Sequence, residues 1–168
     1  MRLKKLTLTA VLTAAALVMF VLESQLPPLT AIPGIKPGLS NIFTFLALIL
    51  YGGGSAFAVI LTKCLLGAVF GGNFSALMYS LPASFAAFAA EYALFRFLFP
   101  KTSLTAISVT AATLHNIVQN LVFCLVTETP EALIYLPYLA LTGAVAGVIV
   151  GLAAYLTVKA LPKNYFAR

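Results

Sequence analysis

Four polar side chains lie close together inside one apolar segment, namely His115, Asn116, Gln119 and Asn120. At about 100° per residue, all four fall on one side of a helix. Polar groups inside a membrane segment usually face the protein interior and mark function, so this cluster predicts a solute-binding site, with hydrogen bonds between helices as the alternative. A lone histidine without further ligands does not indicate a metal site. Because no nucleophile accompanies this one neutral-pH base, the cluster does not indicate an enzyme either.

Lys63 lies in the middle of another apolar segment, about 10 Å from either end if the segment is helical. A lysine this deep does not easily reach the membrane surface, so we expect it to face the interior of a helix bundle. It could bind an anionic or polar solute, or it could form a structural ion pair with Glu91. Glu91 could pair with Lys63 or with Arg96, and we favour a structural role for it. The sequence leaves both interpretations of Lys63 open.

A proline-rich connection leads into a third group of candidate residues. Gly38 permits a tight turn, and Ser40 or Asn41 can cap the helix that follows. The positive end of that helix and Lys36 together favour an anionic group, although an ordinary capped helix start would use the same residues. Asn73 follows Gly71-Gly72 and is expected at the same level of the membrane. We therefore expect Lys36, Asn41 and Asn73 at the entrance of the site.

The elements that position these residues follow from composition. Of the 168 residues, 62% are hydrophobic and 8% are charged, whereas a soluble domain has about 25% charged residues. A spanning helix needs roughly 20 residues, so the sequence predicts an all-α polytopic membrane protein, a six-transmembrane-helix bundle forming a single integral membrane domain. The expected helices are 6–22, 39–51, 56–70, 74–99, 104–126 and 132–161. Gly143, Gly147 and Gly151 recur every fourth residue and predict close packing within the chain.

The charged residues predict an orientation. The net charge is +6, but the Lys and Arg residues lie at the ends of apolar segments and form no patch, which excludes a nucleic-acid-binding protein. Because cytoplasmic loops are rich in Lys and Arg, we expect both termini on the cytoplasmic side of a bacterial plasma membrane. The basic residues expected there are Arg2, Lys4, Lys5, Arg96, Lys101, Lys159, Lys163 and Arg168. The residues expected on the outer side are Lys36, Glu23, Glu128 and Glu131.

Three motifs resemble the Gx transporter family, which is also catalogued as heptaprenyl diphosphate synthase component I. They are Lys36-Pro37-Gly38-Leu39-Ser40-Asn41, Gly71-Gly72-Asn73-Phe74-Ser75 and His115-Asn116-x-x-Gln119. The resemblance covers about residues 5–160, and the family is similar to the substrate-binding S components of energy-coupling factor (ECF) transporters. It implies a six-helix bundle of ECF S-component type, with an outer-facing pocket covered by the first loop. It also implies that Ala10 and Ala14, which match an Ala-x-x-x-Ala motif, contact a transmembrane coupling subunit that engages two ATPases.

The resemblance leaves two functional hypotheses. The first is a substrate-binding subunit for uptake of a small polar or anionic, vitamin-like or precursor solute, with no cofactor. The second is a membrane accessory of prenyl-quinone biosynthesis or of flavin- or quinone-linked electron transfer, with a flavoprotein as a possible partner. The chain contains no Asp and only four Glu, and Mg²⁺ needs such oxygen ligands. We therefore do not expect an intrinsic prenyl diphosphate synthase. The chain also lacks a phosphate-binding Gly-x-x-x-x-Gly-Lys loop.

Overall fold

The apolar segments of the sequence form α-helices in a computed structural model that describes residues 2–25, 38–72 and 74–161. Across those ranges the chain is all-helical, with six α-helices and one short 3₁₀ helix, η1. The elements are α1 (Arg2–Gln25), α2 (Asn41–Tyr51), α3 (Gly53–Gly71), α4 (Phe74–Leu98), α5 (Leu104–Thr127), η1 (Pro130–Tyr135) and α6 (Leu136–Ala160). The expected segment 132–161 thus divides into η1 and α6, and the expected helix 56–70 begins earlier, at Gly53.

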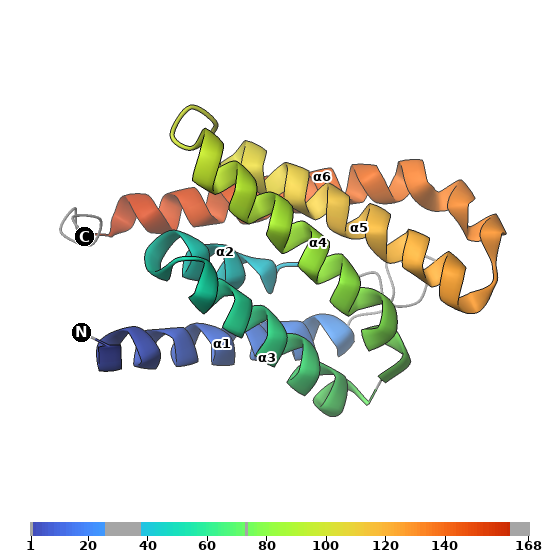
Figure 1. The fold of residues 1–168 in the computed structure, drawn as a ribbon, viewed down its shortest axis with the longest axis horizontal. Coiled ribbons are helices and arrows are strands. Elements are labelled where there is room, and N and C mark those ends of the chain that lie inside the picture. Colours follow the sequence, from blue (N-terminus) through green and yellow to red (C-terminus); the bar gives the residue numbers. More distant parts are fainter. Residues whose placement is uncertain (1, 26–37, 73, 162–168) are drawn as a thin grey trace.

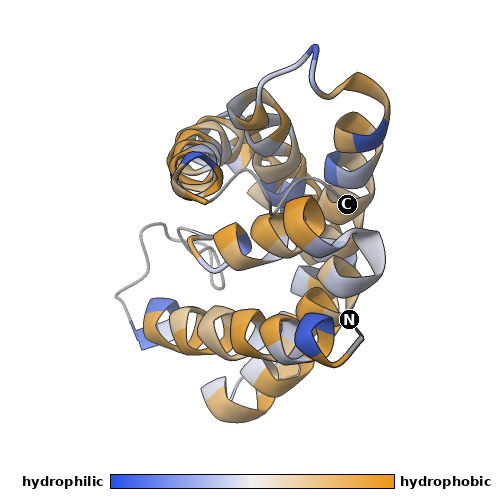
Figure 2. Cartoon of the chain, turned by 90° about the vertical axis from the view of Figure 1, so that its left-hand side faces the viewer, coloured by the Kyte–Doolittle hydropathy of each residue, from blue (hydrophilic) through white to orange (hydrophobic). Residues whose placement is uncertain are grey.

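Five of the described helices are long and apolar enough to cross a membrane, and α2 is the shorter exception. Large apolar side chains cover the outside of the bundle, as the exposed fractions of Phe97 (79%), Leu125 (78%) and Ile134 (78%) illustrate. Seen from the end at which the chain begins, the helices are predominantly hydrophobic (Figure 2). A surface of this kind is stable against lipid and not against water. The chain is therefore a multi-pass membrane protein.

Helix α2 covers only about half of a membrane. Its 11 residues measure about 16 Å at 1.5 Å per residue, against a hydrocarbon core of about 30 Å. It ends at Tyr51, and the φ of +85° at Gly52 interrupts the helical path for one residue before α3 begins. We predicted a stop across Gly52, Gly53 and Gly54, but the latter two belong to α3. Because α2 is this short, the count of six full spans stays a prediction.

The helices pack as two groups that meet along the middle of the bundle (Figure 1). In one group α5 packs against both α4 and α6, and in the other α1, α2 and α3 contact one another. Contacts of α3 with α4 and of α2 with α6 join the two groups. All six helices can therefore present side chains to a common interior.

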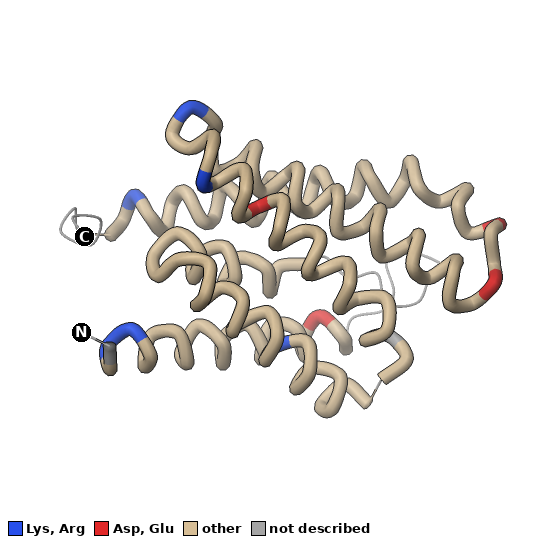
Figure 3. Tube along the Cα trace, viewed as in Figure 1, with Lys and Arg blue, Asp and Glu red and all other residues tan. Residues whose placement is uncertain are grey.

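Charge is distributed unevenly along the bundle. The beginning of α1 and the end of α6 lie at the same end (Figure 1), and Lys and Arg gather there (Figure 3). Glu128 is the C-cap of α5 and Glu131 lies in the first turn of η1, so both carboxylates lie in the connection at the opposite end. The asymmetry is the one that the sequence predicts, and the side that faces the cytoplasm stays a prediction.

The glycine ridge of α6 packs against α5. A methyl group added at Gly147 would lie 2.5 Å from Cα of Val109, and one at Gly151 would lie 2.6 Å from Cα of Thr105. One at Gly143 would lie 2.9 Å from a backbone oxygen of α5. Only hydrogen atoms fit in these gaps, so the two backbones are in direct contact. The predicted close packing within the chain is confirmed.

Candidate functional site

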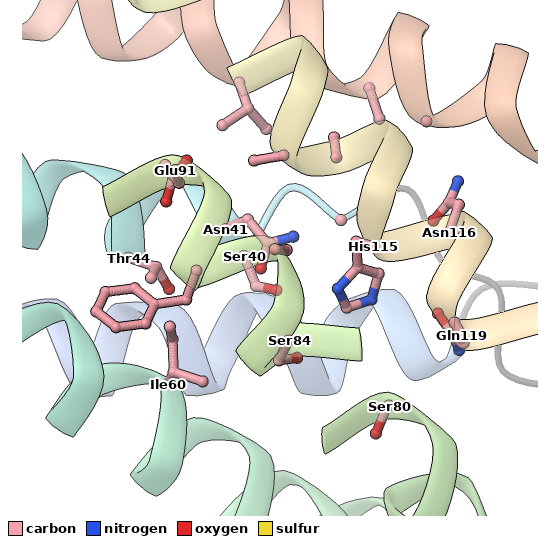
Figure 4. Close-up of a pocket in the computed structure, with 18 of the residues that line it drawn as sticks. Ser40, Asn41, Thr44, Ile60, Ser80, Ser84, Glu91, His115, Asn116 and Gln119 are labelled. Carbon is pink, nitrogen blue, oxygen red and sulfur yellow. The ribbon is translucent and has the colours of Figure 1, made fainter. Parts of the chain in front are cut away.

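A cavity of about 100 Å³ lies between the two groups of helices. All six helices and the turn before α2 contribute to its lining. Serine, threonine, amide, imidazole, carboxyl and amino groups converge on it, and Figure 4 shows ten of its residues with labels. A polar interior is unusual in a bundle whose surface is apolar, and it marks the cavity as the candidate functional site.

Lys63 is the basic side chain of the described cavity lining. Its exposed fraction is 3%, and its Nζ atom donates a hydrogen bond of 2.7 Å to Oδ1 of Asn41. This bond joins the middle of α3 to the first residue of α2, so α2 begins in the interior of the bundle. The expectation that Lys63 faces the interior holds. The ammonium group retains further N–H groups, because a lysine carries three donors.

The turn before α2 has the geometry that the sequence predicts. Gly38 adopts a φ of +73°, and its carbonyl accepts a hydrogen bond of 3.0 Å from the amide of Asn41. Neither expected cap forms as such, because Ser40 occupies the N-cap position without a capping bond from its side chain and the Asn41 side chain binds Lys63 instead. The first two amides of α2 instead donate to the carbonyls of Gly38 and Leu39, so backbone groups cap the start of the helix at the edge of the cavity.

Glu23 lines the candidate site and was not among the residues expected there from the sequence. The side of the membrane on which it lies stays a prediction, but its exposed fraction is 4% and it lines the cavity. One carboxyl oxygen, Oε1, accepts a hydrogen bond from the amide of Leu39. The other, Oε2, is buried without a hydrogen-bond partner. The carboxylate thus binds the turn that leads into α2, where the helix dipole favours a negative charge.

Glu91 also lies in the cavity, on α4. Its exposed fraction is 8%, and Figure 4 shows its carboxyl group near Thr44 of α2. The expected ion pair with Lys63 or Arg96 does not form, since both partners belong to the described chain and neither lies within bonding distance of Glu91. Lys63 is nevertheless near enough to Glu91 for their charges to attract each other without direct contact.

The polar cluster of α5 divides between the cavity and the surrounding packing. His115, Asn116 and Gln119 line the cavity (Figure 4). The Nδ2 atom of Asn116 also donates to the carbonyl of Leu139 on α6, over 3.0 Å. Asn120 is absent from the cavity lining, and its Nδ2 atom donates a bond of 3.1 Å to the backbone of η1. Three of the four predicted residues therefore come together in the cavity, and Asn120 holds η1.

A row of side chains on α4 completes the lining and was also missed. Ser80, Ser84 and Glu91 face the cavity together (Figure 4). The intervals of four and seven residues place them on one face of a helix. A search for polar residues at helical spacing within 74–99 would have found this face. The Sγ atom of Cys64, on α3, lies 3.7 Å from Oγ of Ser84.

The remaining predicted residues lie elsewhere. Lys36 and Asn73 fall outside the described residues. Ala10 and Ala14 are exposed on α1, along the same side as the exposed Val18 and Leu22. In the described part of the chain, no three His, Cys, Asp or Glu side chains group so as to hold a metal ion. That the chain uses no metal or cofactor stays a prediction.

The comparison with known proteins assigns the chain to a family. No curated protein and no solved structure matches it significantly. A family model described as heptaprenyl diphosphate synthase component I matches residues 12–157. That range runs from α1 to α6 and includes every described residue of the cavity. The family expected from the three sequence motifs is therefore confirmed, and the chain belongs to the heptaprenyl diphosphate synthase component I family.

Proposed function

We propose that the chain is the substrate-binding subunit of a membrane uptake system, similar to the S components of ECF transporters. The observation that carries the proposal is the polar cavity inside an apolar bundle, which all six helices line. Polar and charged side chains inside a membrane are expensive unless they serve a purpose. Interhelical packing alone explains Asn116 and Asn120, but it leaves Glu23, Lys63 and Glu91 without ion pairs within the described chain.

The volume of the cavity limits the solute. Sites for drug-sized ligands usually measure about 300–1,000 Å³, and an engineered cavity of about 150 Å³ is filled by benzene. A cavity of about 100 Å³ therefore accommodates a small polar molecule, such as a vitamin precursor, or the polar end of a larger one. Its lining of amide, imidazole and hydroxyl groups supplies hydrogen bonds that would orient such a molecule.

The direction of uptake follows from the charge asymmetry. If the end rich in Lys and Arg is cytoplasmic, both termini face the cytoplasm and the α5–α6 connection faces outward. Glu23 lies in the last turn of α1, near the outward end, and the turn at Gly38 lies beside it. The proposal therefore places capture of the solute on the outer side of a bacterial plasma membrane, next to the start of α2.

An energising partner would dock on α1. Ala10 and Ala14 are exposed there, and two small residues four positions apart let another helix approach closely. The proposal assigns this face to a transmembrane coupling subunit that works with ATPases. Substituting Ala10→Leu and Ala14→Leu should abolish capture of that subunit while the helical content remains, because both side chains lie outside the bundle. Unfolding of the double variant would instead mean that the two alanines pack the bundle.

The bound solute provides the direct test. The full chain is purified in mild detergent, and any small molecule that remains bound is identified by mass spectrometry. Lys63→Met and His115→Ala should lose that molecule and the corresponding uptake, whereas Lys101→Met, in the exposed turn after α4, should retain both. If no molecule is retained, and both cavity variants leave uptake intact, the proposal is wrong.

The family description supports a second candidate, a membrane accessory of prenyl-quinone or flavin-linked metabolism. Its name refers to a prenyl diphosphate synthase, and we propose that any such role is non-catalytic. The described cavity contains two carboxylates from different helices and a lysine, which is not the Asp-rich set that binds magnesium diphosphate. Recovery of a prenyl synthase or a flavoprotein with the purified chain, in place of an ATPase complex, would favour this candidate.

A further inference from the structure

The cavity contains more negative than positive side chains. Among its described lining residues, Glu23 and Glu91 carry carboxyl groups and Lys63 carries the ammonium group. With all three ionised, the formal charge of the described lining is −1. An anionic solute would bring a third negative charge into a site of low dielectric constant, where repulsion is strong. This balance is the opposite of what Lys63 alone suggested.

Two hydrogen-bond donors of the cavity already bind the protein. The ammonium group of Lys63 donates to Asn41, and the amide of Asn116 donates to the carbonyl of Leu139. Each of these groups therefore donates a hydrogen bond within the protein. Donors still remain for a solute, because Lys63 keeps two further N–H groups and the Thr44 hydroxyl has no partner in the described chain. The charge of the lining, and not a shortage of donors, is what disfavours an anion.

The two carboxyl groups of the cavity are underused as hydrogen-bond acceptors. Oε2 of Glu23 is buried and has no hydrogen-bond partner. Glu91 is more than nine-tenths buried, and no described residue donates a hydrogen bond to it or forms an ion pair with it. Buried polar atoms are nearly always hydrogen-bonded, and a buried carboxylate without a partner is strongly destabilising. Oε2 of Glu23 is therefore an orphaned acceptor, and the Glu91 carboxyl group, which lines the cavity, is free to accept a hydrogen bond from a solute.

Glu91 is the better placed of the two to receive this donor. Figure 4 shows its carboxyl group on the same side of the cavity as Thr44, away from His115, Asn116 and Gln119. Glu23 is partly satisfied, because the amide of Leu39 already binds one of its oxygens. A molecule extending across the cavity would meet Glu91 at one end and the amide and imidazole groups of α5 at the other.

We propose that the solute carries a protonated nitrogen group, such as an ammonium, amidinium or guanidinium, and that Glu91 binds this group. The inference rests on the proposed function, since it names the chemical class of the solute for the same cavity. A cationic N–H donor satisfies the free carboxylate, neutralises the excess charge and forms the stronger, charge-assisted kind of hydrogen bond. It makes Glu91 a specificity-determining residue.

Two probes of similar size and opposite charge test the inference. Propylammonium and propionate are titrated separately into the purified full chain in detergent, and binding is measured by calorimetry. We expect propylammonium to bind at least tenfold more tightly than propionate. In Glu91→Gln, which keeps the size of the side chain, this preference should disappear. The matched control is Glu128→Gln, a carboxyl group at the C-cap of α5, which should leave the preference unchanged.

Equal or tighter binding of propionate would overturn the inference, as would an unchanged preference in Glu91→Gln. If that variant does not fold, the preference of the wild-type chain decides alone. Binding of neither probe also counts against the inference, whereas the proposed function is judged separately by the molecule retained on purification. A retained molecule without a basic nitrogen would refute this inference and leave the proposed function standing.

Discussion

Replacing Gly147 by alanine tests the contact between α5 and α6 with one added methyl group. The new Cβ atom would lie 2.5 Å from Cα of Val109 and 2.9 Å from the backbone oxygen of Ser108. These are backbone atoms, so no side chain can rotate away to make room. Carbon atoms in favourable contact lie about 3.5–4.0 Å apart. The two helices must therefore separate locally by about 1 Å to accept the methyl group.

The expected cost follows from this separation. Inserting a methyl group into a well-packed interior usually costs about 1–3 kcal/mol, and a gap of about 1 Å forfeits up to half of the dispersion energy of the neighbouring atoms. Alanine favours a helix over glycine by up to about 1 kcal/mol, which offsets part of the loss. We expect Gly147→Ala to lower the free energy of unfolding by about 1–2 kcal/mol. The scaling for chains of 150–250 residues converts this to a midpoint lowered by about 2–8 °C.

The chain supplies its own reporter of unfolding. It contains no tryptophan, but Cys64 and Cys124 are free and buried, so a thiol-reactive dye reacts with them only as the bundle opens on heating. The control is Gly54→Ala in the first turn of α3, where an added methyl group meets nothing within 4 Å. This control should melt at or slightly above the wild-type temperature. If Gly147→Ala melts no lower than Gly54→Ala, the backbone contact between α5 and α6 is not as described.

Three further substitutions distinguish residues that shape the cavity from residues that stabilise the helix bundle. Gly67→Ala would place a methyl group 2.4 Å from the ring of Phe20, a side chain that lines the cavity. The ring should move into the cavity, so less solute should be retained when the purified chain is analysed by mass spectrometry. The melting temperature should change little. Asn41→Ala removes the partner of the buried Lys63 ammonium and should destabilise the chain by about 1.5–3 kcal/mol in the same dye assay, and a melting temperature equal to wild type would show that the bond contributes nothing. Asn120→Ala should lower the free energy of unfolding by about 1–2 kcal/mol through the lost hydrogen bond to η1 and should leave the amount of retained solute unchanged. Loss of the solute at wild-type stability would show that Asn120 binds the solute.

The sequence predicted the helices well because their signal is local. Runs of apolar residues identify membrane helices wherever they occur. The spacing of the glycines in α6 was by itself enough to predict a close contact between helices. The bounds of α2 were also nearly right, since Gly38 and Gly52 enclose it. The position of α2 within the membrane was harder to predict, because it depends on the bond between Asn41 and Lys63, which are 22 residues apart.

The lining of the cavity was predicted in part, and the differences have physical causes. Glu23 follows an apolar segment directly and resembles a loop residue; it is buried because the chain returns 16 residues later and offers the amide of Leu39 to its carboxylate. On α5 the residue about 140° around the helix from His115, Asn120, lies past the edge of the cavity. A helical projection gives the polar side, but it does not say where the neighbouring helix begins to cover that side. Here η1 covers it.

The short length of α2 has a consequence for how the chain enters the membrane. At about 16 Å, α2 is too short to be released into the bilayer as an independent segment, and α3 contains Lys63, whose insertion alone costs about 2.5–3.5 kcal/mol. Together the two helices avoid both problems. Asn41 of α2 binds the ammonium group of α3, and Gly52 alone separates α2 from α3. We therefore expect the translocation machinery to release α2 and α3 together as a hairpin. A nascent chain cut after Tyr51 should leave α2 on the side opposite the N-terminus, which glycosylation mapping can detect, and synthesis of α3 should draw it in.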